Sequence, residues 1–230
     1  MNTLRLTAAL LLSPALLAAQ GNDVSQYIDA DRTAEVALAR TAAPKNVSDS
    51  ATVLFLTPTG YEVVSRGTNG FTCAVIREFA MPYTDPAKWN PRVRAPHCFN
   101  ATAAASVLAQ FLEVSKWVVT GVSHTEVLAR TERNFRSRSF AMPGPGAMAY
   151  MLSPKQYLAD DHPHWMPHLM FYYERASQPA SRFGGAGMDA PVIDASAGEP
   201  AYPITTILIP VRQWSDGTPD GVHAPEGAAR

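Results

Sequence analysis

The sequence predicts an α+β fold: a mainly antiparallel sheet of about five strands, with an N-terminal helix and a helical hairpin packed on one face. Apolar residues recur at helical spacing before residue 44 and between residues 100 and 136. The other apolar runs are short and rich in β-branched and aromatic residues, which is typical of strands. Long crossover segments, which parallel strands require, are scarce between these runs, so antiparallel pairing is expected.

The first predicted element is a helix that begins at an N-cap, Asn22 or Asp23, and ends near residue 43. Its apolar residues form a loose stripe, and Pro44 stops it because proline cannot continue a helix. The other face of this helix is polar, so we expect it at the domain surface.

Two strands are expected next, at residues 52–65 and 71–79. The first is interrupted at residues 57–60 by Thr-Pro-Thr-Gly, a turn or bulge, and residues 67–70 form a tight reversal between the two strands. Residues 81–96 hold four prolines and are expected to form an irregular surface crossover that covers a sheet edge.

Two helices joined by a short turn are the clearest local signal. Asn100 is the predicted N-cap of the first, whose apolar residues keep the i, i+3, i+4 spacing to residue 119 before Gly121 ends it. Ser123 and Glu126 then form a capping box that starts the second helix. So short a connection predicts an antiparallel helical hairpin.

The C-terminal half is predicted to add three strands, at residues 147–152, 169–174 and 204–211. Residues 176–201 separate the last two as a long flexible loop, because they contain few large apolar side chains. The glycines at 184–187 lack the strand and helix that flank a phosphate-binding loop, so no phosphate site is predicted there.

The two ends of the chain predict export and a single folded domain. Residues 1–20 combine one basic residue, a short apolar run and small residues, which is the pattern of a secretory signal peptide. Residues 21–214 are then expected to form one α+β domain, and residues 215–230 a disordered tail. No later segment is long and apolar enough to span a membrane. We therefore expect a periplasmic or secreted protein.

Charge and cysteine content narrow the functional class. A formal net charge of −1 gives no general attraction to nucleic acid, so no nucleic-acid partner is expected. Cys73 and Cys98 are expected to form a disulfide, the usual state of two cysteines in an exported chain. The alternative is a reactive thiol at Cys98 beside His97, but adjacent side chains in a strand point to opposite faces.

Three histidines, His162, His164 and His168, lie at even steps between two predicted strands. In extended backbone their rings would project from one face, and three imidazoles with one open position suit zinc or another divalent metal. A metal-dependent hydrolase is therefore one hypothesis. Two prolines interrupt this stretch, so the alternative is that each ring caps the sheet and bonds to backbone carbonyls.

Two further hypotheses involve no catalysis. In the one that we favour, the exported domain binds a small ligand or an envelope partner near residues 160–174, between the sheet and the loop at 176–201. This hypothesis predicts an apolar pocket lined by Trp165, Met170 and Tyr172. In the other, the protein is a structural component of the cell envelope, and its histidines are scattered and individually bonded.

Three segments carry a resemblance to known proteins: TPTGYEVVSRGTNGFTC at residues 57–73, HWMPHLMFYYE at residues 164–174 and WSDGTP at residues 214–219. They resemble a family of exported bacterial proteins for which no activity is established, and the likeness covers most of the mature chain. This resemblance implies an exported, single-domain protein and contributes no catalytic residues.

Overall fold

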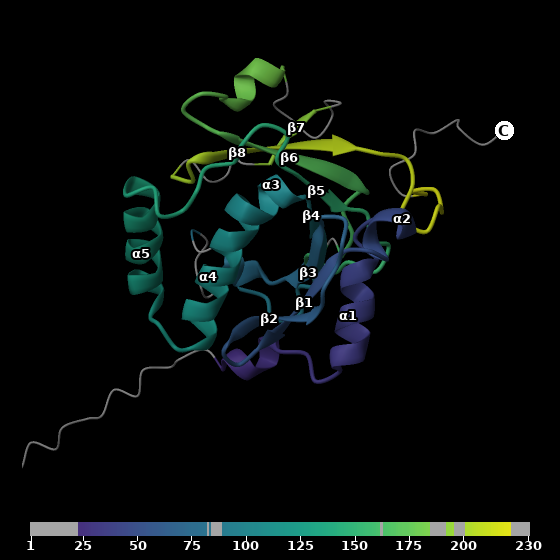
Figure 1. The fold of residues 1–230 in the computed structure, drawn as a ribbon, viewed down its shortest axis with the longest axis horizontal. Coiled ribbons are helices and arrows are strands. Elements are labelled where there is room, and N and C mark those ends of the chain that lie inside the picture. The colour runs from purple at the N-terminus through teal and green to yellow at the C-terminus, as the bar shows by residue number, and fades with distance from the viewer. Residues whose placement is uncertain are drawn as a thin grey trace, which may run out of the picture.

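The fold is α+β, as predicted, and is built on one mixed sheet with helices on both faces (Figure 1). The computed structural model describes residues 23–81, 83, 89–161, 163–184, 192–195 and 201–221. The predicted signal peptide lies outside these residues, as does the end of the chain from residue 222. No helix among the described residues is long and apolar enough to cross a membrane.

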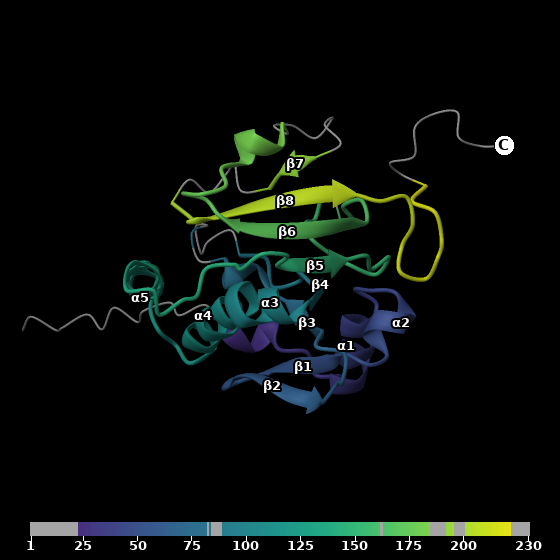
Figure 2. The same ribbon diagram turned by 45° about the horizontal axis from the view of Figure 1, so that its top comes forward.

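The sheet has the strand order β2-β1-β3-β4-β5-β6-β8-β7, and Figure 2 shows the strands stacked in that order. Every neighbouring pair is antiparallel except β1 and β3, which run parallel. The strands are β1 (Thr52–Thr57), β2 (Gly60–Ser65), β3 (Thr72–Ile76), β4 (Ala95–Phe99), β5 (Met148–Met151), β6 (His168–Glu174), β7 (Ile193–Asp194) and β8 (Ile204–Pro210).

The helical elements are mostly short. They are the 3₁₀ helices η1 (Val24–Tyr27), η2 (Glu78–Ala80) and η5 (Ala180–Phe183), the α-helices α1 (Arg32–Arg40), α2 (Lys45–Ser48), α3 (Ala101–Ala103), α4 (Ala109–Val119) and α5 (His124–Arg136), and a π-helical turn (Ala104–Leu108). The predicted N-terminal helix is therefore wrong in extent. Asp31 caps α1 by accepting from the backbone N–H of Ala34 at 2.9 Å, so the chain re-enters a helix there instead of continuing one from residue 22.

The predicted count of about five strands is corrected to eight in the described part. The stretch at residues 52–65 is two strands, β1 and β2, joined as a true hairpin by the turn after Thr57. After β2 the chain passes across the start of β1 and enters β3 on the other side, so β3 pairs with β1 in parallel. Gly67 lies at this crossing, where a Cβ would overlap the backbone of residues 50–52. The expected hairpin between β2 and β3 therefore does not form.

Helices cover both faces of the sheet, which corrects the prediction that they share one face. Alternate residues of β1, β3 and β4 face opposite sides, as strand geometry requires. Val53, Val75 and Cys98 pack with Ala39 under α1, whereas the alternating set that includes Ile76 packs into the core on the α4 side. Figure 1 shows α1 and α4 on opposite sides of these strands.

The predicted helix pair forms at the expected place, with Ser123 as the N-cap of α5. It differs in detail, because a π-helical turn precedes α4 and the two helices do not both lie on the sheet. Helix α4 packs against β2 and η2, while α5 packs mainly against α4. Val127 and Phe135 are the buried residues through which α5 joins the main core.

The predicted disulfide is confirmed, because the sulfur atoms of Cys73 and Cys98 lie at bonding distance. The two cysteines are directly paired residues of β3 and β4, with Cα atoms 4.0 Å apart. Residues 215–221, expected as the start of a disordered tail, form a turn in which the backbone N–H of Ser215 donates to Leu152 O at 2.8 Å.

Candidate functional site

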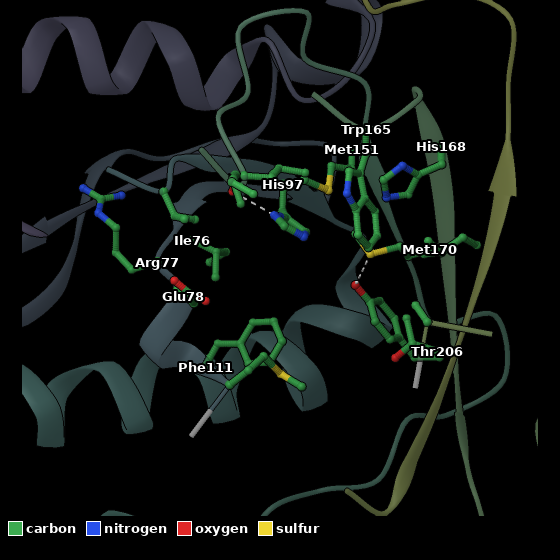
Figure 3. A pocket seen from close by; sticks show the side chains of 18 of the residues that line it. Ile76, Arg77, Glu78, His97, Phe111, Met151, Trp165, His168, Met170 and Thr206 are labelled. Atoms are coloured by element: carbon green, nitrogen blue, oxygen red, sulfur yellow. Dashed lines mark hydrogen bonds between the residues drawn. The ribbon is translucent and has the colours of Figure 1, made fainter. Parts of the chain in front are cut away.

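A cavity of about 390 Å³ lies on the α4 side of the sheet, and most of its wall is apolar (Figure 3). Strands β4, β5, β6 and β8 supply its floor, Phe111 of α4 covers one side, and the β5–β6 connection adds Leu158 and Trp165. The other lining residues are Ile76, Arg77, Glu78, Met81, Val93, Ala95, His97, Met151, Ala159, His168, Met170, Tyr172, Ala195, Tyr202, Thr206 and Leu208.

Two histidines lie in this cavity on strands that flank β5. His97 belongs to β4 and His168 to β6, where His168 is paired directly with Met151 of β5. All three side chains line the cavity and so project from the same face of the sheet. Figure 3 shows Met151 between the two rings, as the strand order requires.

Both imidazoles are fixed in one tautomer by backbone carbonyl groups. His97 Nδ1 lies 2.8 Å from Ala95 O, and His168 Nδ1 lies 2.7 Å from Met166 O. A carbonyl oxygen can only accept a hydrogen bond, so each Nδ1 carries a proton and donates it. In a neutral ring, the Nε2 atom is then left with a lone pair and acts as an acceptor.

The rings are neutral at pH 7 because they are buried. Burial lowers the pKa of His97 to about 4, with a smaller effect from the neighbouring His168, and the bond to Ala95 opposes this shift. Burial likewise lowers the pKa of His168 to about 4. A base this weak is poorly matched to proton abstraction near neutral pH. The two rings are therefore better suited to accept hydrogen bonds from a bound molecule than to drive acid–base catalysis.

Two charged side chains of the wall, Arg77 and Glu78, have hydrogen-bond partners that do not line the cavity. The Arg77 guanidinium donates to Tyr27 O at 2.7 Å, to Val75 O at 2.6 Å and to the buried Glu35 carboxylate at 2.5 Å. Figure 3 shows this side chain directed away from the centre of the cavity. The Glu78 carboxylate accepts from the backbone N–H of Asn90 at 2.5 Å, and its pKa is raised by burial.

The two tyrosines of the wall also have internal partners. Tyr172 donates its hydroxyl to the sulfur of Met170 at 3.4 Å, and the Tyr202 hydroxyl donates to Gln110 Oε1 at 3.0 Å. Burial raises the pKa of both phenols, so neither is ionised at pH 7. Besides apolar surface, the wall thus presents two imidazole acceptors, the Glu78 carboxylate and the Thr206 side chain.

The structure brings together some of the residues that the sequence analysis selected. Trp165, Met170 and Tyr172 all line the cavity, and the binding role assigned to them stays a prediction. Leu158, Ala159 and Trp165 of the β5–β6 connection line the cavity, and of the described residues between 176 and 201 only Ala195 does so.

The three histidines of the metal hypothesis have different surroundings. His168 is 1% exposed in the cavity wall, His164 is exposed at the surface, and His162 lies outside the described residues. Within the part of the chain that the structure describes, no group of three His, Cys, Asp or Glu residues is placed to hold a metal ion. A site that uses all three histidines stays a prediction.

His97 is the site residue that the sequence analysis missed as a ligand-facing group. It enters the sequence analysis only as a neighbour of Cys98, in the alternative of a reactive thiol. The alternation of Ala95, His97 and Phe99 is the signal that would have placed these side chains on one face of a strand. Met151 and Phe111 were predicted as strand and helix residues, but nothing local indicated that they line a cavity.

Comparison with known proteins found no match, either among protein-family models or among curated proteins and solved structures. The resemblance to exported bacterial proteins accordingly stays an expectation. The functional inference is based on the shape and the chemistry of the cavity.

Proposed function

We propose that this protein binds a small, uncharged and mainly apolar molecule in the cavity on the α4 side of the sheet. The observation that carries the proposal is an apolar-walled cavity of about 390 Å³ with two neutral imidazole acceptors in its wall. Small-molecule sites usually measure roughly 300–1,000 Å³ and combine an apolar lining with a few polar groups that orient the ligand.

Entry to the cavity is supported by the exposure of one aromatic residue of its wall. Trp165 is 38% exposed, although large apolar side chains are normally covered. It lies in the β5–β6 connection, whose Gln156 side chain donates to Trp165 O at 2.6 Å. A ligand that passes this ring would gain apolar contact with Trp165 and remove its surface from water.

We also propose that binding takes place outside the cytoplasm. The Cys73–Cys98 pair supports this setting, because disulfides persist in oxidising compartments and are rare in the cytosol. A non-catalytic binding role is preferred to hydrolysis by general acid–base catalysis because the low pKa values of the cavity's two histidines make them weak bases near neutral pH.

The experiment that tests the proposal is a fluorescence titration with N-phenyl-1-naphthylamine, a neutral probe that brightens in apolar surroundings. Ala159→Trp introduces a large side chain into the cavity wall from a half-buried loop position. Ala176→Trp is the matched control, because Ala176 is exposed in the turn after β6 and does not line the cavity.

We expect saturable binding of one probe molecule per chain to the wild type and to Ala176→Trp. We expect Ala159→Trp to lose at least tenfold in affinity because its indole occupies the space. Equal binding to the two variants, or a signal that never saturates in the wild type, would show that the cavity is not the binding site.

A further inference from the structure

We infer that His97 and His168 select ligands that donate hydrogen bonds, so the cavity takes an uncharged apolar molecule with a hydroxyl or N–H group, such as a phenol or alcohol. This inference rests on the proposed function and names the chemical class of its ligand. It excludes two kinds of otherwise similar molecule: those whose polar atoms only accept, and those that carry a negative charge.

The two imidazoles offer hydrogen-bond acceptors to a ligand, and no donors. The Nδ1–H of each ring is already used by a backbone carbonyl, and neither Nε2 has a hydrogen-bond partner among the described residues. His97 is 8% exposed and His168 is 1% exposed, so both acceptors lie in the protein interior. Neither Nε2 atom is among the fully buried polar atoms that lack a partner, so each keeps access to the cavity, where a donor on a ligand can take the place of water.

The two acceptors have fixed positions in the cavity wall. The rings lie on either side of β5, with Met151 between them on the cavity floor. His97 is held by stacking on Phe99, with ring centroids 5.4 Å apart and planes at 8°, and Trp165 lies 6.3 Å from the His168 ring. Both acceptors are thus set in rigid, aromatic-walled positions, where an aromatic ligand would pack against flat side chains.

The charged side chains of the cavity wall disfavour an anionic ligand. Arg77, a cation of the wall, is fully buried and paired with Glu35, and Figure 3 shows its side chain directed away from the centre of the cavity. Glu78 adds a carboxylate to the same wall. A bound anion would therefore meet two lone pairs and a carboxylate without a cation to balance it, which is costly in an apolar site. A carboxylate ligand is disfavoured for this reason.

A soft metal ion is the main alternative for these side chains. Two imidazole Nε2 atoms and a thioether are ligands that copper accepts, and metal-binding histidines commonly donate their other N–H to a carbonyl. The cavity is much larger than an ion requires, and most of its wall is hydrocarbon. These two features favour an organic ligand, and metal binding is included as an outcome of the test.

The test is competition against N-phenyl-1-naphthylamine by three compounds of one shape: 4-pentylphenol, 4-pentylanisole and 4-pentylbenzoate. The phenol donates a hydrogen bond, the anisole only accepts, and the benzoate is an anion. We expect the phenol to compete about tenfold more tightly than the anisole, and the benzoate to be the weakest of the three.

The variants assign this preference to the two rings. His97→Phe and His168→Phe keep a flat ring and remove the acceptor, so we expect each to bring the affinities for phenol and anisole to within about threefold of each other. His164→Phe is the matched control, because His164 is exposed and outside the cavity wall, and it should keep the wild-type preference. Circular dichroism checks that each variant is folded. If a variant is not folded, the ratio of the wild-type affinities for the phenol and the anisole decides whether the site prefers a donor.

Three results would overturn the inference. If the phenol and the anisole bind the wild type equally well, the donor preference is wrong while the proposed function stands. If the benzoate binds most tightly, the charge argument is wrong. If elemental analysis of purified wild type finds one copper or zinc per chain that His97→Phe loses and His164→Phe keeps, the histidines form a metal site. Absence of any probe binding would instead refute the proposed function itself.

Discussion

Acid should destabilise this protein through His97 and His168. Burial sets the pKa of each ring at about 4, whereas a histidine in an unfolded chain titrates near 6.5. When the pH falls below about 6.5, the unfolded state takes up protons that the folded state does not bind. The contribution of the two neutral rings to the free energy of unfolding is therefore fully present above the unfolded pKa of about 6.5. It is lost progressively as the pH falls from about 6.5 to about 4.

The magnitude follows from these two pKa values. At pH 5 an unfolded histidine is almost fully protonated, whereas a ring with a pKa near 4 is about one-tenth protonated. Proton linkage then gives a loss of about 2 kcal/mol per histidine between pH 7.5 and pH 5, or about 4 kcal/mol for His97 and His168 together. That is a large share of the roughly 5–15 kcal/mol by which proteins of this kind are stable.

The assay is urea unfolding at pH 7.5 and pH 5.0 for the wild type, His168→Phe and His164→Phe. The other titrating groups, apart from the one histidine that each variant replaces, are shared by the three proteins and cancel in the comparison. We expect His168→Phe to lose about 2 kcal/mol less than the wild type on acidification, and His164→Phe to match the wild type. Identical losses in all three proteins would mean that His168 is not a buried neutral base, and the description of the site would be wrong.

Three further changes test the fold. Replacing both cysteines, Cys73→Ala with Cys98→Ala, should lower the free energy of unfolding by about 3 kcal/mol for a sequence separation of 25, and reduction with dithiothreitol should shift the urea midpoint of the wild type but not of this variant. Arg77→Met should destabilise by about 3–5 kcal/mol because it leaves the Glu35 carboxylate buried and unpaired; adding Glu35→Leu should recover most of the loss, and a double variant no better than the single one would contradict this account. Gly67→Ala should cost about 1–3 kcal/mol in thermal unfolding because its methyl group meets the β1 backbone, and an unchanged melting temperature would argue against the parallel β1–β3 crossing.

Local patterns predicted most of the elements, because those patterns reflect interactions between near neighbours. The N-cap at Ser123 and the ends of β6 and β8 follow from side chains within a few residues. The failures come from contacts that are distant in sequence. Strand β4 follows three prolines and contains a fourth, Pro96, and it pairs on one side with β3 and on the other with β5, some 50 residues later. The residues of β4 do not indicate which two strands it pairs with.

The parallel β1–β3 pair could not be predicted for a related reason. The turn after Thr57 and the glycines at residues 67 and 70 each favour a reversal, and local signals do not show which strand lies beside which. Gly67 is required by the approach of the chain to residues 50–52, a contact that exists only once β3 has passed to the far side of β1. The helices were wrongly assigned to one face because β1, β3 and β4 bury both of their faces.

The two histidines connect the stability of this protein to its proposed function. A cavity wall built only for packing would be better served by apolar side chains, because burial of an imidazole costs desolvation free energy and the depressed pKa adds a loss of stability in acid. His97 and His168 instead keep their Nδ1 protons on backbone carbonyls and leave both Nε2 atoms without a partner among the described residues. A donor on a ligand would satisfy these two acceptors, so the same two rings whose burial lowers the stability of the protein in acid would contribute to affinity and to the choice of ligand.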